Sequence, residues 1–151
     1  MRILQNLENS GSVWDVSISS VTTVFLPGTY SVGGPSGMTL TISKGVSSSV
    51  TGTISASVTA QAGVIFASAS TTLGVSLALS QTVTDSVGGS MVVPSNVASG
   101  YLTLGSVGRS FTATATQYNN NCVVIAGPYT GPVTGASTVY YVQPSWLPFT
   151  P

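Results

Sequence analysis

The sequence predicts an all-β protein, an antiparallel β-sandwich or jelly-roll-like domain that contains a long amphipathic hairpin rich in Ser and Thr. Three observations lead to this prediction. Apolar and hydroxyl-bearing residues alternate over long stretches, which places them on opposite faces of extended strands. β-branched and aromatic residues are abundant, and clusters of Gly and Pro divide the chain into short segments. No window of the sequence has a convincing helical spacing of apolar residues.

The clearest alternation lies near residues 48–61 and 73–86, on either side of residues 62–70. In both stretches apolar residues or Gly take nearly every second position, and Ser, Thr or Gln fill most of the positions between them. We expect these stretches to form either one long hairpin or two core strands with a third strand between them. The alternating apolar positions are Val50, Gly52, Ile54, Ala56, Val58 and Ala60 in the first stretch, and Leu73, Val75, Leu77, Leu79 and Val83 in the second.

The rest of the chain reads as shorter strands separated by turn residues, which include Pro27-Gly28, Asn119–Asn121 and Gly127-Pro128. The expected strands are Val13–Thr23, Thr39–Ser43, Met91–Val93, Tyr101–Leu104, Ser110–Gln117, Cys122–Ile125 and Thr138–Val142. The length of 151 residues suits one β domain. Its expected parts are N-terminal strands (1–43), long alternating strands (44–87), further sheet (88–118), and last strands with a Pro-rich and aromatic-rich tail (119–151).

The chain carries very little charge. Only 4% of its residues are charged, compared with roughly 25% in ordinary soluble domains. No basic or acidic face can be assembled from so few charges, so we do not expect nucleic acid as a partner. The six charged residues are Arg2, Glu8, Asp15, Lys44, Asp85 and Arg109.

The N-terminal residues lack the apolar run of a signal peptide, and no segment approaches the about 18 uninterrupted apolar residues of a membrane helix. If Met1 is the natural start, the protein is made in a cytoplasm and leaves by lysis or another non-standard route. The expected location is therefore a virion or the extracellular space.

The residues give no basis for an enzyme. The sequence has no histidine, its three carboxylates are scattered, and neither a nucleophile elbow nor a phosphate-binding glycine loop occurs. We expect no catalytic residue, no cofactor and no metal ligand, because the acids are too few for calcium and no His or Cys pairs exist for zinc. Cys122, the single cysteine, is expected to be a small buried apolar residue.

Long strands with few charges have edges that pair readily with other chains, and the usual protection by Lys, Pro or bulges is missing here. We therefore expect copies of the same chain, and other subunits of an assembly, to be the partners. Large amphipathic rings are enriched at such interfaces. The interface candidates are Trp14, Tyr140, Tyr141, Trp146 and Phe149.

These features favour a non-enzymatic structural subunit of a larger symmetric assembly. The most fitting assembly is a virus or bacteriophage particle, in which the chain would be a capsid decoration, fibre or tail protein. Such subunits reach the outside by lysis rather than secretion, and each can cover its strand edges with its neighbours. A surface adhesin or other binding module is a further alternative.

The stretch from Ile42 to Tyr118 offers a second hypothesis from a different class. It contains an alternating Ser/Thr-rich strand (47–61), a short amphipathic segment (62–70), a second alternating strand (71–86) and then the step Val93-Pro94. This order resembles the membrane-inserting module of the aerolysin and epsilon-toxin family of β-pore-forming proteins. The resemblance implies that the amphipathic segment around Val64, Ile65 and Phe66 refolds into a transmembrane hairpin. Only in that case would a membrane be a partner.

Overall fold

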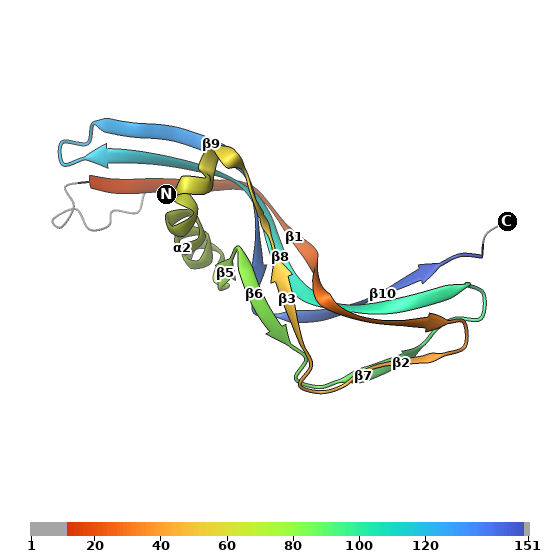
Figure 1. Ribbon diagram of the computed structural model, residues 1–151. Helices are drawn as coiled ribbons and strands as arrows, with labels where there is room; N and C mark the ends of the chain where they lie inside the picture. The colour runs from red at the N-terminus through yellow and green to blue at the C-terminus, as the bar shows by residue number, and fades with distance from the viewer. Residues whose placement is uncertain (1–11, 150–151) are drawn as a thin grey trace. The chain divides into compact units, whose positions relative to one another are not determined.

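The structure is a computed structural model that describes residues 12–149 (Figure 1). Most of these residues lie in strands, and the long strands belong to one large open antiparallel sheet, so the all-β prediction is confirmed at this level. The elements in chain order are β1 (Ser12–Pro35), β2 (Thr39–Ile42), β3 (Ser47–Thr51), β4 (Thr53–Ile54), η1 (Ala56–Gln61), α2 (Ala62–Leu73), β5 (Leu77–Ala78), β6 (Ser80–Thr84), β7 (Gly89–Val92), β8 (Ser99–Asn119), β9 (Val124–Ser137) and β10 (Tyr140–Leu147).

The described chain folds into two compact units. Unit 1 consists of residues 12–24, 52–79 and 108–135, and unit 2 consists of residues 25–51, 80–107 and 136–149. The long strands β1, β8 and β9 each contribute to both units. The expectation of one domain over residues 1–151 stays a prediction.

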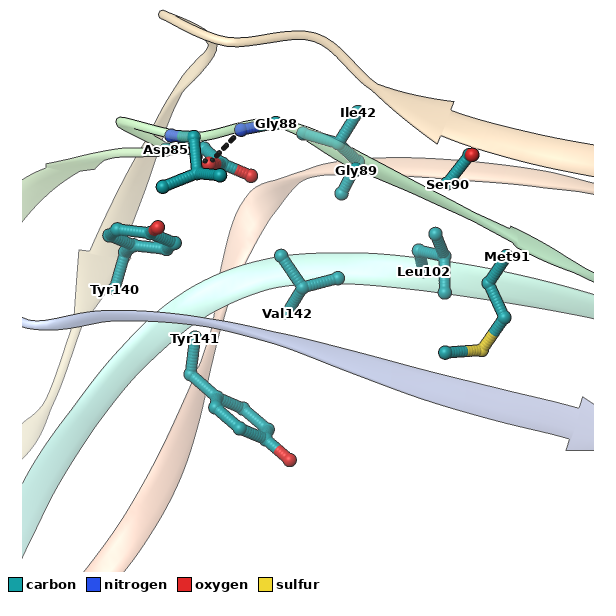
Figure 2. Close-up of a pocket in the computed structure, with 11 residues that line it drawn as sticks. Ile42, Asp85, Gly88, Gly89, Ser90, Met91, Leu102, Tyr140, Tyr141 and Val142 are labelled. Atoms are coloured by element: carbon teal, nitrogen blue, oxygen red, sulfur yellow. Dashed lines mark hydrogen bonds between the residues drawn. The ribbon is translucent and has the colours of Figure 1, made fainter.

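Unit 2 is built from short antiparallel pairs of strands. β3 pairs with β6, β2 pairs with β7, and β10 pairs with β8 along its whole length. Alternate residues of β2 and β3 are buried, as the period-two pattern predicts. In Figure 2, Leu102 of β8 and Val142 of β10 face the side chains of β7. The buried core of unit 2 consists of Leu40, Ile42, Val50, Val83, Val93, Leu102, Leu104 and Ala136.

Two expected turns lie inside strands, so these two predictions are wrong. Gly28 lies within β1, where an added Cβ would overlap the Ser48 Oγ and the Leu104 carbonyl oxygen. Glycine is therefore required because neighbouring strands approach closely, not because the chain reverses. Gly127 lies within β9, with φ of 85° and a cis peptide bond to Pro128. The β8–β9 register shifts beside it, between Ala115 and Tyr118, and the strand continues.

Unit 1 contains a sheet of long strands in the order β9–β8–β1. β8 and β9 pair from Arg109↔Gly135 to Tyr118↔Val124, and the expected strand Ser110–Gln117 is confirmed within β8. The row of threonines in this strand alternates with buried alanines, and the Thr114 and Thr130 hydroxyls hydrogen-bond across the pair at 3.0 Å.

Cys122 is exposed, so the expectation of a buried thiol is wrong. The residue lies in the turn between β8 and β9 with φ of 60°, and its N–H donates to the Asn119 carbonyl oxygen at 3.0 Å. Strand β9 begins only at Val124. The turn that the asparagines form therefore includes Cys122, although the apolar residues beside it indicate a strand.

Candidate functional site

Residues 56–73 are helical, although the alternation of the sequence predicts extended strands and no helix over them. η1 continues directly into α2, so this prediction is wrong between the two short strands β4 and β5. The physical reason is a second period in the same residues. Apolar side chains recur every three or four positions, which gives one apolar stripe along a helix. They are Val58, Ala62, Ile65, Phe66, Ala69 and Leu73.

Local signals define both ends of the helical segment. The Ser55 Oγ accepts a hydrogen bond from the Ser57 N–H at the first turn. Gly74 ends α2 in the left-handed region with φ of 70°, and its N–H donates to the Ser70 carbonyl oxygen at 3.0 Å. Left-handed glycine is the common C-terminal stop of a helix. The Ser70 Oγ also accepts from the Leu77 N–H at 2.9 Å, which fixes the chain after the turn.

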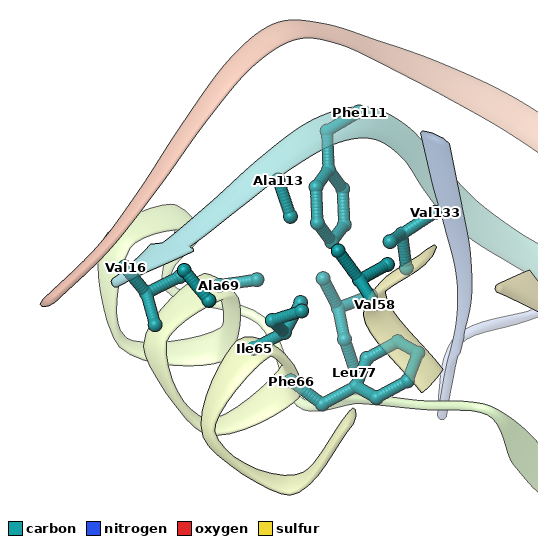
Figure 3. Packing of buried hydrophobic residues seen from close by; sticks show 10 residues of the cluster. Val16, Val58, Ile65, Phe66, Ala69, Leu77, Phe111, Ala113 and Val133 are labelled. Atoms are coloured by element: carbon teal, nitrogen blue, oxygen red, sulfur yellow. The ribbon is translucent and has the colours of Figure 1, made fainter. Parts of the chain in front are cut away.

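The apolar stripe packs onto the sheet of unit 1 (Figure 3). Ile65 and Ala69 of α2 are fully buried and point toward Phe111 and Ala113 of β8 in Figure 3. Gly135 leaves room for this contact, because an added Cβ would lie 2.9 Å from the Phe66 ring. The buried cluster consists of Val16, Val58, Ile65, Phe66, Ala69, Leu77, Phe111, Ala113, Ala115 and Val133.

The chain leaves the β3–β6 strand pair at Gly52, before the helical segment begins. β3 and β6 pair up to Thr51↔Ser80, and the Gly52 N–H still donates to the Leu79 carbonyl oxygen at 2.7 Å. Beyond Gly52 the chain turns to β9 instead, where β4 pairs as Thr53↔Thr134. An added Cβ at Gly52 would overlap the Thr134 carbonyl oxygen. Residues 52–79 are therefore an insertion between two paired strands, and we call them the tongue.

The β3–β6 register can be continued through the tongue. The residue numbers of each β3–β6 pair add up to 131, so the next pairs run from Gly52↔Leu79 to Val64↔Ala67, with Ile65 and Phe66 as the turn. Residues directly opposite in an antiparallel pair share a face. One face would then carry Gly52, Ile54, Ala56, Val58, Ala60, Ala62 and Val64 with Ala67, Ala69, Thr71, Leu73, Val75, Leu77 and Leu79. The other would carry Thr53, Ser55, Ser57, Thr59, Gln61 and Gly63 with Ser68, Ser70, Thr72, Gly74, Ser76 and Ala78.

The sequence of the tongue thus fits the helical arrangement of the structure and would also segregate its apolar residues in a continued hairpin. As a helical segment it packs on the sheet of unit 1, and a continued hairpin would present an apolar face with Thr71 as the single hydroxyl. It carries no charged residue. Among the residues 12–149, the Gln61 Oε1 is the buried side-chain atom without a hydrogen-bond partner. A buried polar atom without a partner lowers the free energy of unfolding by about 1–3 kcal/mol. In the continued hairpin the Gln61 side chain would lie on the polar face.

The candidate residues from the sequence lie in both units. In the tongue, Val64 is half-buried, Ile65 is fully buried and Phe66 is nearly so, and all three pack in unit 1. Of the interface candidates, Trp14 packs against the core of unit 1, and Tyr140 and Trp146 pack against that of unit 2. Tyr141 is exposed and makes an edge-on contact with Phe25 at 5.7 Å between ring centres, and Phe149 is exposed.

Comparison with protein-family models, with curated proteins and with solved structures found no match. Within the described residues, no three His, Cys, Asp or Glu side chains gather where they could hold a metal ion. None of the helical segments in residues 12–149 is long and apolar enough to cross a membrane.

Proposed function

We propose that this protein is a β-pore-forming protein whose tongue leaves unit 1, extends the β3–β6 pair into an amphipathic hairpin and inserts into a lipid bilayer. The observation that carries the proposal is the double pattern of residues 52–79. One sequence fits a docked helix and also a hairpin with one apolar and one polar face in the register that β3 and β6 already have. A segment with two competing packings is the element that a conformational switch requires.

The dimensions of the hairpin fit a bilayer. Each arm has thirteen residues, from 52 to 64 and from 67 to 79, whereas a transmembrane strand needs about 9–11. The apolar face would contact lipid and the Ser/Thr face would line water. Unpaired backbone groups are costly in hydrocarbon, so several copies must join their hairpins into a closed ring of strands. The partners are therefore copies of the same chain.

Apolar burial and hydrogen bonds of the tongue would be replaced rather than lost on insertion, which supports a conformational switch rather than unfolding. Docked, the apolar residues of the tongue are covered by Phe111, Val133 and their neighbours. Inserted, they are covered by lipid tails, so the apolar burial is replaced rather than lost. The helical hydrogen bonds are likewise replaced by bonds between strands. The state without a membrane keeps the helix, because a free hairpin would expose its apolar face to water.

The test is dye release from lipid vesicles. The full chain is added to vesicles that are made from total lipid extract and contain a self-quenching dye. In a second experiment, single-channel conductance steps are recorded in planar bilayers. We expect release that rises more steeply than linearly with protein concentration, because several copies build one pore. Absence of release and of conductance steps at high ratios of protein to lipid overturns the proposal.

A second candidate function is a structural subunit of a larger assembly, such as a virus or phage particle. The observation that favours it is that unit 2 exposes several large apolar side chains, which neighbouring subunits would cover. They are Met38, Val87, Met91, Val92, Tyr101, Val139, Tyr141, Leu147 and Phe149. Ordered assemblies in lipid-free buffer, seen by light scattering and electron microscopy together with intact vesicles, would favour this candidate. We propose that the pore former reaches its target membrane from the extracellular space and that the structural subunit belongs to a virion.

The sandwich that the sequence predicts is, in this proposal, confined to unit 2. There Leu40 and Ile42 of the two-stranded sheet β2–β7 share one buried core with Leu102 and Leu104 of β8. This packing supports a role for unit 2 as the body that holds β3 and β6 while the tongue rearranges.

A further inference from the structure

Unit 2 contains a cavity of about 580 Å³ that the proposed function does not use (Figure 2). It is bounded by β2, the β6–β7 connection, β7, β8 and β10. Its volume lies within the roughly 300–1,000 Å³ of small-molecule sites, which are mostly apolar with few polar groups. Apolar walls come from Ile42, Leu102 and Val142, and exposed Val87 and Met91 also line the cavity.

One formal charge lines this cavity. Asp85 is only 3% exposed, and its Oδ1 accepts hydrogen bonds from the Val87 N–H at 2.9 Å and the Gly88 N–H at 2.7 Å. These two bonds hold the carboxylate in place. Lys44, the other charged residue of unit 2, is exposed and is not among the lining residues.

The charged lining residue lies at one end of the cavity, and the polar residue Ser90 lies at the other end, where its hydroxyl points away from Leu102. Figure 2 shows Asp85 and Tyr140 at one end and Leu102 and Met91 at the other. Alternation along β10 turns Tyr140 and Val142 toward the cavity, whereas Tyr141 points to the other side of the strand in Figure 2. The lining therefore complements an amphiphilic ligand. It has a carboxylate and an aromatic ring at one end and aliphatic side chains at the other.

We propose that this cavity binds a small amphiphile with an organic cation at one end and an apolar tail. The buried carboxylate attracts a cation and repels an anion, and weak screening inside the cavity strengthens this choice. A quaternary ammonium group also gains attraction from an aromatic face, which Tyr140 offers beside Asp85. The tail would lie against Leu102 and Met91. The lining contains no residue of the tongue.

Calorimetric titration of the full chain tests the proposal in lipid-free buffer. The probes are decyltrimethylammonium, decyl sulfate and the neutral decanol, all below their aggregation concentrations. We expect one decyltrimethylammonium per chain, bound at least about tenfold more tightly than decyl sulfate, which corresponds to one charge contact. Equal affinity for the cation and the anion, or no saturable binding, overturns the proposal.

Two variants locate the binding. Asp85→Asn keeps an oxygen for the Val87 and Gly88 N–H groups and removes the charge, so the affinity for the cation should fall about tenfold and that for decanol should not change. Gly89→Leu adds a side chain where a Cβ meets no atom within 4 Å, on the same face of β7 as Met91. It should weaken all three probes while the melting temperature stays close to that of the wild type. Unchanged cation binding in either variant places the ligand elsewhere and overturns the assignment.

Discussion

Replacing Ala60 by lysine is expected to abolish dye release from vesicles while the free protein stays folded. Ala60 is exposed in η1, so a lysine there reaches water in the docked tongue. In the continued hairpin the same residue lies on the apolar face, near the middle of the arm formed by residues 52–64. A lysine facing lipid at the bilayer midplane costs about 2–4 kcal/mol. Release should therefore fall at least about thirtyfold at equal protein concentration.

Thr72→Lys is the matched control for this prediction. Thr72 is also exposed in the docked form, and in the continued register it lies opposite Thr59, one pair away from Ala60↔Thr71. The two lysines would thus have the same depth but opposite faces. Thr72→Lys should keep release within about twofold of the wild type, because its ammonium faces the water-filled side. Equal loss in both variants, or no loss in Ala60→Lys, contradicts the assignment of the faces.

A disulfide between the tongue and β9 is expected to block release completely and reversibly. Ile54 of β4 lies opposite Val133 of β9, and the neighbouring pair is bonded from the Ser55 N–H to the Pro132 carbonyl oxygen at 3.0 Å. Ile54↔Val133 is therefore a non-hydrogen-bonded pair, with Cα atoms about 4.5 Å apart, which suits a disulfide. The double variant Ile54→Cys/Val133→Cys is made with Cys122→Ser, and release is measured before and after reduction.

The control is a disulfide at the base of the β3–β6 pair, which exists in both arrangements. Ser47 and Thr84 are opposite each other, and their hydroxyl oxygens lie 2.9 Å apart. Ser47→Cys/Thr84→Cys should release dye in the oxidised and the reduced state alike. The account fails if the oxidised β4–β9 cross-link releases dye as the wild type does, or if the two cross-links have the same effect.

The strands were predictable wherever the burial of side chains follows a period of two residues alone. Residues 110–117 alternate and lie in β8, and the stretches around Val50 and Val83 pair as the antiparallel strands β3 and β6. The cores of both units draw on these alternating residues. Two glycines misled the prediction of turns. Gly28 and Gly127 look like chain reversals in sequence, but their roles depend on neighbouring strands that no local pattern reveals.

The helix was not predictable from alternation because the tongue satisfies two periods at once. Val58, Ala62, Ile65, Ala69 and Leu73 fit a helical stripe, and each of them except Ile65 also falls on the apolar face of the continued hairpin. Docking against β8 and β9 decides between the two, and that contact is long-range. Ser55 as an N-cap and Gly74 as a helix stop were the local signals that could have indicated the helix. The same ambiguity is the basis of the proposed function.

The most direct test of the account follows the tongue itself, residue by residue. Single cysteines at each position from 56 to 64, in a Cys122→Ser background, carry a fluorophore that reports water or lipid. In the free protein, shielding should follow the helix, with a maximum at Val58, which is fully buried. With vesicles that leak, the account predicts strict alternation, with even-numbered positions in lipid and odd-numbered positions in water. Leaking vesicles with an unchanged helical spacing of three to four residues would contradict it.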